Sequence, residues 1–293
     1  MELDRQGRRW YKGNLHAHTT VSDGRKTPEE CIALYKSKNY DFLALTDHWK
    51  WRDGEMQDDM LLFSGVEYNI GGADVLKGVY HIIAAGMKQP AALEKKEPEH
   101  TVQEIIDAIH AEDGIAILAH PAWSLNISGE VMQYHGFDGV EIYNSVSGVP
   151  WNARPYSGQF VDELACRGYY MPCMAADDCH FYNGDQTKSY LMVQAEELTR
   201  ESILSAIRKG DFYATQGPRF ESITIEDGKV IVKCSPVKDI VFYSNLVYHK
   251  DRCTRGEGVT YAESNINPQE TYIRVELVDE NGNCAWSSPI PLK

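Results

Sequence analysis

The sequence contains no long hydrophobic run. Its apolar stretches all fall short of the ~18 residues that a membrane-spanning helix requires. The first residues, Met1 to Arg5, also lack the apolar segment of a secretory signal peptide. Because hydrophobic residues make up 43% of the chain and charged residues 25%, we expect a soluble, globular protein located in the cytoplasm.

Positive charge is scarce relative to negative charge. The chain has 29 Lys and Arg residues against 43 Asp and Glu residues, which gives a formal net charge of −14. Nonspecific nucleic-acid binding depends on basic patches that displace counterions from phosphates. The charge balance therefore argues against a nucleic-acid polymer as the partner and against an exonuclease, and it suits the binding of cations.

Cysteine patterns typical of disulfide frameworks and zinc fingers are also absent. The seven cysteines are odd in number, and no pair has Cys-x-x-Cys spacing. We interpret them as reduced thiols. The chain shows no internal repeat or low-complexity tract, so the remaining interpretation is one large domain or two unequal ones.

Between residues 13 and 217, short apolar runs alternate with helical patterns, which is typical of an α/β domain with a mainly parallel sheet. Thr27-Pro28-Glu29-Glu30 and Thr101-Val102-Gln103-Glu104 each have the capping-box pattern that begins a helix. Gly210 suits the left-handed position that follows a helix. We predict helices over 28–38, 102–112, 156–167 and 200–209.

Beyond residue 217 the pattern changes to short alternating strands joined by tight turns. Asp227-Gly228 and Asn281-Gly282 are hairpin signals, because Asp, Asn and Gly adopt positive φ easily. We therefore predict an α/β domain over 1–217 and a small antiparallel β-sandwich domain over 218–293.

Metal-binding residue types lie at or near the ends of the apolar runs. Because the carboxyl ends of parallel strands meet at one rim, such residues converge even when they are far apart in sequence. His16 and His18 are two residues apart and therefore point the same way from an extended chain. Imidazole and carboxylate together favour Zn, Mn or Fe. The motifs in chain order are His16-Ala17-His18, Ser22-Asp23-Gly24, Thr46-Asp47-His48, Gly65-Val66-Glu67, Tyr80-His81, His120-Pro121 and Asp177-Asp178-Cys179-His180.

These motifs resemble those of the PHP (polymerase and histidinol phosphatase) superfamily of metal-dependent phosphoesterases, over about residues 10–217. The resemblance implies a distorted (β/α)7 TIM-like barrel whose rim holds two or three divalent transition-metal ions. Asp177 is a neighbouring alternative to Asp178, which we prefer for its spacing to His180. The implied ligands are His16, His18, Glu67 and Asp178 for the first ion; Glu67, His81 and His120 for the second; and Asp23, His48 and His180 for the third.

Two later segments, 208–217 and 285–290, resemble the two-domain branch that includes carbaryl-hydrolase-type metallohydrolases. We therefore expect a phosphoesterase in which a hydroxide that bridges two metals attacks a small phosphate ester. A carboxyl- or carbamate-ester hydrolase on the same site is one alternative, and a non-catalytic metal-binding scaffold is another. The sequence carries no signal for the oligomeric state.

Several further residues are candidates for roles beside the metals. Glu67 is the expected bridging carboxylate, and Asp47 is a candidate to orient His48 or a metal-bound water. Loop cations are candidates for binding phosphate, with an ordinary surface charge as the alternative: Arg25, Lys26, Arg154 and Lys188. Four tryptophans near the rim motifs either stack on a substrate ring or pack in the core: Trp49, Trp51, Trp123 and Trp151.

Overall fold

The computed structural model describes residues 8–72, 78–95 and 100–292. The start of the chain, Met1 to Arg5, for which we predict no signal peptide, lies outside these residues. Within the described ranges, no helix combines the length and apolarity needed to cross a membrane.

The four predicted helices are confirmed to within two residues at each end. Both capping boxes form, with Thr27 paired to Glu30 and Thr101 paired to Glu104. Gly210 has a φ of 73° and ends the last helix in the left-handed conformation. The described α-helices are α1 (Pro28–Lys36), α2 (Val102–Ala111), α3 (Pro121–Ser124), α4 (Ser128–Val131), α5 (Gly158–Ala165) and α6 (Arg200–Lys209).

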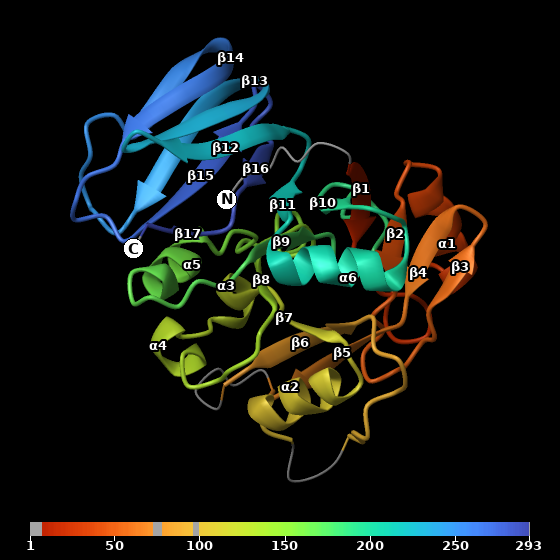
Figure 1. The fold of residues 1–293 in the computed structure, drawn as a ribbon. Helices are drawn as coiled ribbons and strands as arrows, with labels where there is room; N and C mark the ends of the chain where they lie inside the picture. The colour runs from red at the N-terminus through yellow and green to blue at the C-terminus, as the bar shows by residue number, and fades with distance from the viewer. Residues whose placement is uncertain (1–7, 73–77, 96–99, 293) are drawn as a thin grey trace.

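The strands form a mixed α/β fold with two sheets (Figure 1). The smaller sheet has five strands in the order β5-β6-β7-β8-β9: β5 (Gly65–Ile70), β6 (Tyr80–Ala85), β7 (Ile115–Leu118), β8 (Gly139–Asn144) and β9 (Cys173–Ala176). The larger sheet includes β1 (Arg9–Asn14), β2 (Phe42–Ala44), β3 (Glu55–Gln57), β4 (Met60–Phe63), β10 (Tyr190–Ala195) and β11 (Phe212–Thr215).

The prediction of a mainly parallel sheet is wrong, because both sheets contain antiparallel strand pairs as well as parallel ones. β1 pairs with β2 in parallel but with β10 antiparallel, and β6 pairs antiparallel with both β5 and β7. Instead of one continuous barrel ladder, single bridges at Ala17–Cys179 and His48–Glu67 connect the two sheets. Both bridges involve motifs that carry metal-binding residue types, so the places where the two sheets meet position these side chains.

The C-terminal strands are antiparallel, as predicted, and Asp227-Gly228 forms the first hairpin turn with positive φ at both residues. They continue the larger sheet, because β16 pairs with β11 through Ala214 and Trp286, and the predicted two-sheet sandwich is not confirmed. The division at residue 217 stays a prediction. These strands are β12 (Phe220–Glu226), β13 (Lys229–Ser244), β14 (Cys253–Asn265), β15 (Tyr272–Val278), β16 (Cys284–Trp286) and β17 (Ile290–Pro291).

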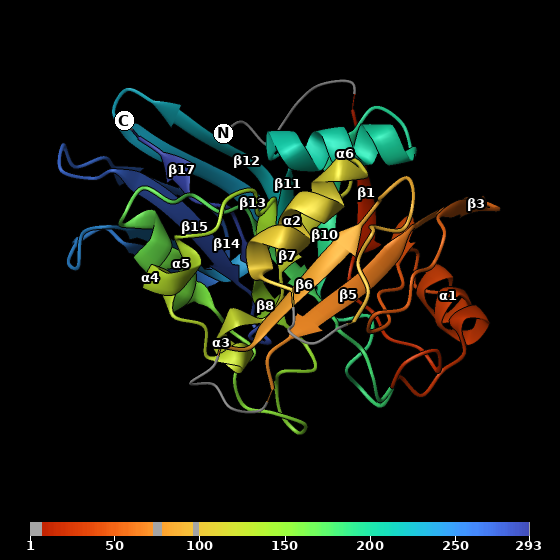
Figure 2. The same cartoon turned by 90° about the horizontal axis from the view of Figure 1, so that it is seen from below.

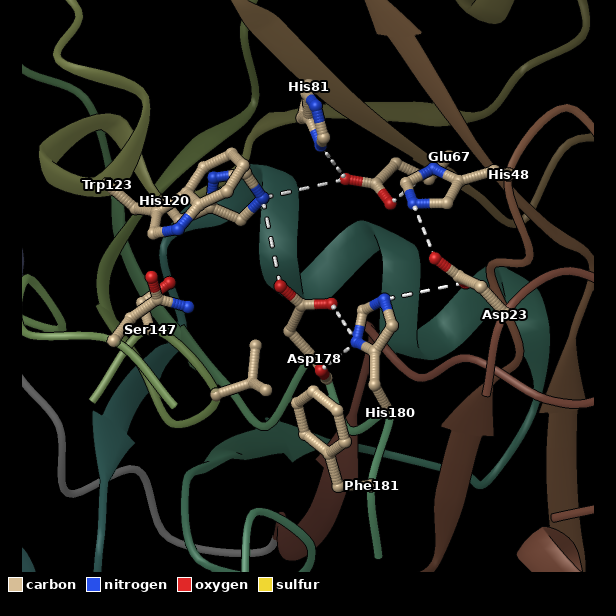
Figure 3. A pocket seen from close by; sticks show the side chains of 12 residues that line it. Asp23, His48, Glu67, His81, His120, Trp123, Ser147, Asp178, His180 and Phe181 are labelled. Atoms are coloured by element: carbon tan, nitrogen blue, oxygen red, sulfur yellow. Dashed lines mark hydrogen bonds and ion pairs between the residues drawn. The ribbon is translucent and has the colours of Figure 1, made fainter. Parts of the chain in front are cut away.

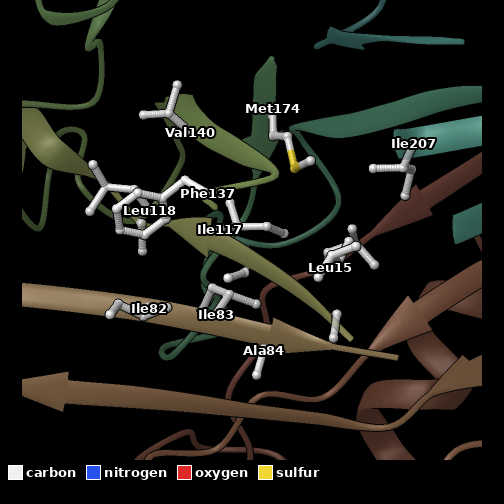
Figure 4. Packing of buried hydrophobic residues seen from close by; sticks show 14 of the residues in the cluster. Leu15, Ile82, Ile83, Ala84, Ile117, Leu118, Phe137, Val140, Met174 and Ile207 are labelled. Carbon is white, nitrogen blue, oxygen red and sulfur yellow. The ribbon is translucent and has the colours of Figure 1, made fainter. Parts of the chain in front are cut away.

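The main hydrophobic core lies between the two sheets and the helices that cover them. Figure 4 shows Leu15, Ile83 and Ile117 packed together within it. α2 packs on β6 and β7, and Figure 2 shows it lying across these strands. This packing leaves the motif-bearing strand ends at one face, where the candidate site lies.

Candidate metal centre

All nine side chains that the resemblance implies as metal ligands meet at this face. Seven of them line a cavity of about 230 Å³ (Figure 3), whereas His16 and His18 are fully buried and do not line it. The cavity is lined by Asp23, His48, Glu67, His81, His120, Trp123, Val146, Ser147, Asn152, Asp178, His180 and Phe181.

Glu67 lies at the centre of the cluster and faces a different group of histidines with each oxygen. Its Oε2 atom lies 3.0 Å from His18 Nε2 and 3.0 Å from His48 Nδ1. Its Oε1 atom lies 2.9 Å from His81 Nδ1 and 3.6 Å from His120 Nε2. One buried carboxylate therefore joins two sets of imidazoles, which is the geometry expected of a bridging ligand.

Asp178 approaches the same centre from the end of β9. Its Oδ1 atom lies 3.0 Å from His16 Nε2 and 3.1 Å from His18 Nε2, and these two nitrogens are 3.1 Å apart. Asp178 has a φ of 51° and His120 a φ of 29°, conformations that are costly for residues with a Cβ. Such strain at two site residues is typical of functional sites that the surrounding fold holds in place.

The donor set fits a divalent cation. Glu67 Oε2 and Asp178 Oδ1 are buried and have no hydrogen-bond partner among the described residues, although such atoms are costly to leave unpaired. Both point at imidazole nitrogens, so a cation would be their common partner. Three overlapping groups offer atoms within 4.8 Å of one another: His16, His18, Glu67 and Asp178; His48, Glu67 and His81; and His18, Asp23, His48 and His180.

The charged side chains of the cluster shift one another's pKa values. Burial lowers the pKa of His16, but Asp178, Glu141 and Glu67 outweigh this effect and raise the pKa well above its usual value. Burial opposes ionisation of Glu67, yet the neighbouring histidines hold its pKa well below the usual range. The carboxylates that favour a proton on His16 would also favour a cation beside it, because metal and proton compete for the same ligand atoms.

The outer group, around Asp23, is more open to solvent. His180 Nε2 lies 3.5 Å from Asp23 Oδ1, and His48 Nε2 lies 3.7 Å from Asp23 Oδ2. His180 Nδ1 donates to the backbone carbonyl of Asp178 at 2.7 Å, which leaves its Nε2 directed at Asp23. Gly24 is required here, because a Cβ on it would lie 2.4 Å from the carbonyl oxygen of His18.

Glu141 and Asn144, on β8, complete the site and were not among the predicted residues. Glu141 Oε1 accepts from His16 Nδ1 at 2.7 Å, and Oε2 accepts from the backbone N–H of His120 at 2.9 Å. Asn144 Nδ2 donates to Glu141 Oε2 and also to Asp178 Oδ2, at 2.8 and 3.1 Å. The only sequence signal for Glu141 is a charged residue inside an apolar strand.

Two predicted carboxylates lie outside the metal-type cluster, by which we mean the nine implied ligand side chains that meet at this face. Asp47 accepts hydrogen bonds from the backbone and hydroxyl groups of Thr19 and Ser22 at 2.7 to 3.1 Å. Both its oxygens are engaged by the loop that carries Asp23, and a role for Asp47 in orienting His48 or a metal-bound water stays a prediction.

Asp177 accepts from Tyr35 Oη at 2.7 Å and from the backbone N–H groups of residues 187 to 189. Its burial raises the pKa of this carboxyl to about 6. Asp177 therefore supports the following loop, whereas Asp178 is the one that lies among the histidines, as we preferred. Cys179, between two cluster residues, is buried and accepts from Tyr35 Oη at 3.3 Å.

The predicted phosphate-binding cations do not line the cavity. Arg25, Arg154 and Lys188 are exposed, and the described lining residues include no lysine or arginine. Arg25 instead lies over the ring of Phe181, with its guanidinium carbon 4.9 Å from the ring centre. The lining residues outside the implied ligand set are uncharged, and Trp123 is the one predicted tryptophan in the described lining.

No family model matches the chain, and no curated protein matches it. Its structure is similar to that of a two-domain protein from Bacteroides vulgatus ATCC 8482 that contains a predicted PHP-like metal-dependent phosphoesterase, with a TM-score of 0.54, 14% identity, and 98% of this chain and 97% of that chain covered. An amidohydrolase from Chromobacterium violaceum, with bound sulfate and no metal, matches with a TM-score of 0.43 and 14% identity, over 59% of this chain and 89% of that chain. The first likeness confirms, at the level of the fold, the resemblance inferred from the motifs.

Proposed function

We propose that this protein is a metal-dependent hydrolase that cleaves a small phosphate ester. One observation carries the proposal: the buried oxygens Glu67 Oε2 and Asp178 Oδ1, which accept no hydrogen bond from the described residues, lie 3.0 to 3.4 Å from the Nε2 atoms of His16 and His18. A purely structural ion-pair network would be expected to satisfy these oxygens with hydrogen bonds. The shared fold with a PHP-like protein is consistent with this function.

Two of the three ligand groups implied by the sequence motifs coincide with clusters in the structure. The third cluster has His48, Glu67 and His81, and His120 Nε2 lies 3.6 Å from Glu67 Oε1 beside it. His16, His18, Glu67 and Asp178 would hold the first ion, and Glu67 would share the second with His81 and His120. Asp23, His48 and His180 would hold a third, with His18 also within reach. The mixture of imidazole and carboxylate favours Zn, Mn or Fe. Such ions, when bound, supply a water of low pKa and neutralise charge on the phosphate oxygens.

The chain's own residues fix the ligands and bound the substrate. Glu141 accepts from His16 Nδ1, so the Nε2 lone pair of His16 faces the cluster. Asn144 holds one oxygen of Asp178 and leaves the other turned toward His16 and His18. Ser147 and Asn152 also line the cavity and are uncharged groups that can hydrogen-bond to the part of the substrate away from the ions.

The uncharged lining residues also favour a second candidate, hydrolysis of a carboxyl or carbamate ester on the same site. Neither substrate needs a side-chain cation, and the described lining provides none. The two candidates differ in the charge of the substrate, because a phosphate ester depends on the ions alone for its neutralisation.

A hydrolysis screen on protein loaded with Mn, Zn or Fe tests the proposal. We expect turnover of a phosphomonoester, its loss with EDTA, and partial recovery with Mn. Glu67→Gln should abolish turnover, whereas Glu130→Gln, on the exposed surface of α4, should retain it. Turnover of carboxyl or carbamate esters alone would favour the second candidate. Bound metal without any turnover would support a non-catalytic scaffold.

A further inference from the structure

The lining residues outside the metal-type cluster are uncharged, and two of them, Trp123 and Phe181, are aromatic rings that lie beside cluster histidines. From this arrangement, which rests on the proposed function, we infer that the substrate is a phosphomonoester with a small, uncharged aromatic leaving group. Trp123 and Phe181 would bind that group. Figure 3 shows Trp123 beside His120, and Phe181 next to His180 and Asp178, so both rings border the space that the cluster faces.

Both rings are held in place by contacts on the protein side. Trp123 meets His120 edge-on with ring centres 4.9 Å apart and an interplanar angle of 80°, and it meets His81 at 5.6 Å. Phe181 stacks on Trp151 at 5.6 Å with an angle of 3°. Side chains that are already ordered lose little conformational freedom on binding, so an aromatic ligand gains most of the contact energy.

The size of the cavity restricts the leaving group. Its volume of about 230 Å³ is below the ~300 to 1,000 Å³ typical of sites for drug-sized ligands. One phosphate and one ring-sized group suit this space better than a nucleotide or a polymer does.

The charge of the lining restricts the leaving group in a second way. Outside the metal-type cluster, the described lining consists of Trp123, Val146, Ser147, Asn152 and Phe181, none of which is charged. An additional anionic group on the ring would therefore be desolvated without a cation in the described lining, because Arg25, over the ring of Phe181, does not line the cavity. A separate hollow shares His48 with the cavity and is lined by Lys50 and Lys95. A substrate with a second anion would have to use that hollow, so the two substrate classes can be told apart.

Equilibrium binding of phosphonates to the metal-loaded protein tests the inference, because phosphonates are not hydrolysed. We expect phenylphosphonate to bind about tenfold more tightly than methylphosphonate, the order of one well-packed aromatic contact. Trp123→Ala and Phe181→Ala should each reduce this ratio, and Trp123→Phe should largely restore it. Trp51→Ala is the matched control and should preserve the ratio, because Trp51 does not line the cavity. Elemental analysis of each variant checks that its metal content is unchanged.

Equal binding of the two phosphonates to the unmodified protein would overturn the inference. So would an unchanged ratio in both alanine variants, or tighter binding of 4-carboxyphenylphosphonate than of phenylphosphonate. The outcome is distinct from that of the proposed function: aryl selectivity in binding without turnover of any phosphomonoester would refute the phosphoesterase and keep the aromatic subsite. Turnover without aryl selectivity would do the reverse.

Discussion

His16 and Glu141 are 125 positions apart in the sequence, and His16 Nδ1 lies 2.7 Å from Glu141 Oε1. The contact joins the end of β1 to the middle of β8, and thus the larger sheet to the smaller one. The other oxygen of Glu141 accepts from the backbone N–H of His120. A single buried glutamate therefore positions proposed ligands of two different ions.

Glu141→Gln is expected to weaken metal binding by roughly 10- to 100-fold, the usual cost of losing a carboxylate that orients a ligand histidine. The amide can still accept from His16, but its NH₂ group cannot accept from His120. Competition with a fluorescent chelator measures the affinity directly, without any assay of activity. Glu130→Gln is the surface control, and an equal affinity in both variants would contradict the positioning role.

Glu67→Gln is expected to lower the metal content more than the loss of any single histidine. Each Glu67 oxygen faces a different imidazole set, so this substitution should release about two equivalents, whereas His81→Ala should release about one. Elemental analysis of reconstituted, desalted protein measures both. If Glu67→Gln retains two ions, the carboxylate does not bridge.

Arg274→Leu is expected to destabilise the fold by roughly 1 to 3 kcal/mol, because it removes charged hydrogen bonds to Asp162, whose side chain is partly exposed. Arg274, on β15, is fully buried and binds Asp162 of α5 at 2.8 and 3.0 Å. The midpoint of urea unfolding, followed by circular dichroism, reports the loss. Lys229→Leu breaks the exposed pair with Glu263 and should change the midpoint little. Equal midpoints for the two variants would show that the ion pair between Arg274 and Asp162 does not stabilise the packing of β15 against α5.

His110 should make the stability depend on pH. Its hydrogen bond to Asp138 at 2.9 Å raises the pKa of the imidazole above 6.5. The folded state therefore binds the proton more tightly than the unfolded state, so this stabilisation is complete below pH 6.5 and is lost as the pH rises through the raised pKa. We expect an effect on the order of 0.5 kcal/mol, because the pair is partly exposed.

Unfolding of the unmodified protein and of His110→Gln at pH 6 and pH 9 measures this dependence. The unmodified protein should have the larger advantage at pH 6. An advantage that grows toward pH 9 would reverse the assigned sign.

Local features were predictable from the sequence because their causes are local. The capping boxes at Thr27 and Thr101 depend on residues three positions apart, and both helices begin where they were predicted. Likewise, His16 and His18 point to a shared centre because of the strand's two-residue period.

Features that depend on distant pairing were not predictable in this way. The antiparallel position of β10 beside β1 and the continuation of the sheet through β16 are set by contacts between remote segments. Glu141 was missed for the same reason: it lies between buried Val140 and Ile142 in what looked like an ordinary strand. A charged residue inside an apolar run was the available signal, because buried carboxylates need partners.

The number of transition-metal ions bound per chain tests the central claim most directly. The cluster offers more ligand-type side chains than one four-coordinate ion can use. After reconstitution with Mn, Zn or Fe and removal of free metal, elemental analysis should therefore find more than one equivalent per chain, with anomalous scattering beside His16 and Glu67. Less than roughly half an equivalent, or no anomalous peak at this cluster, would contradict the account.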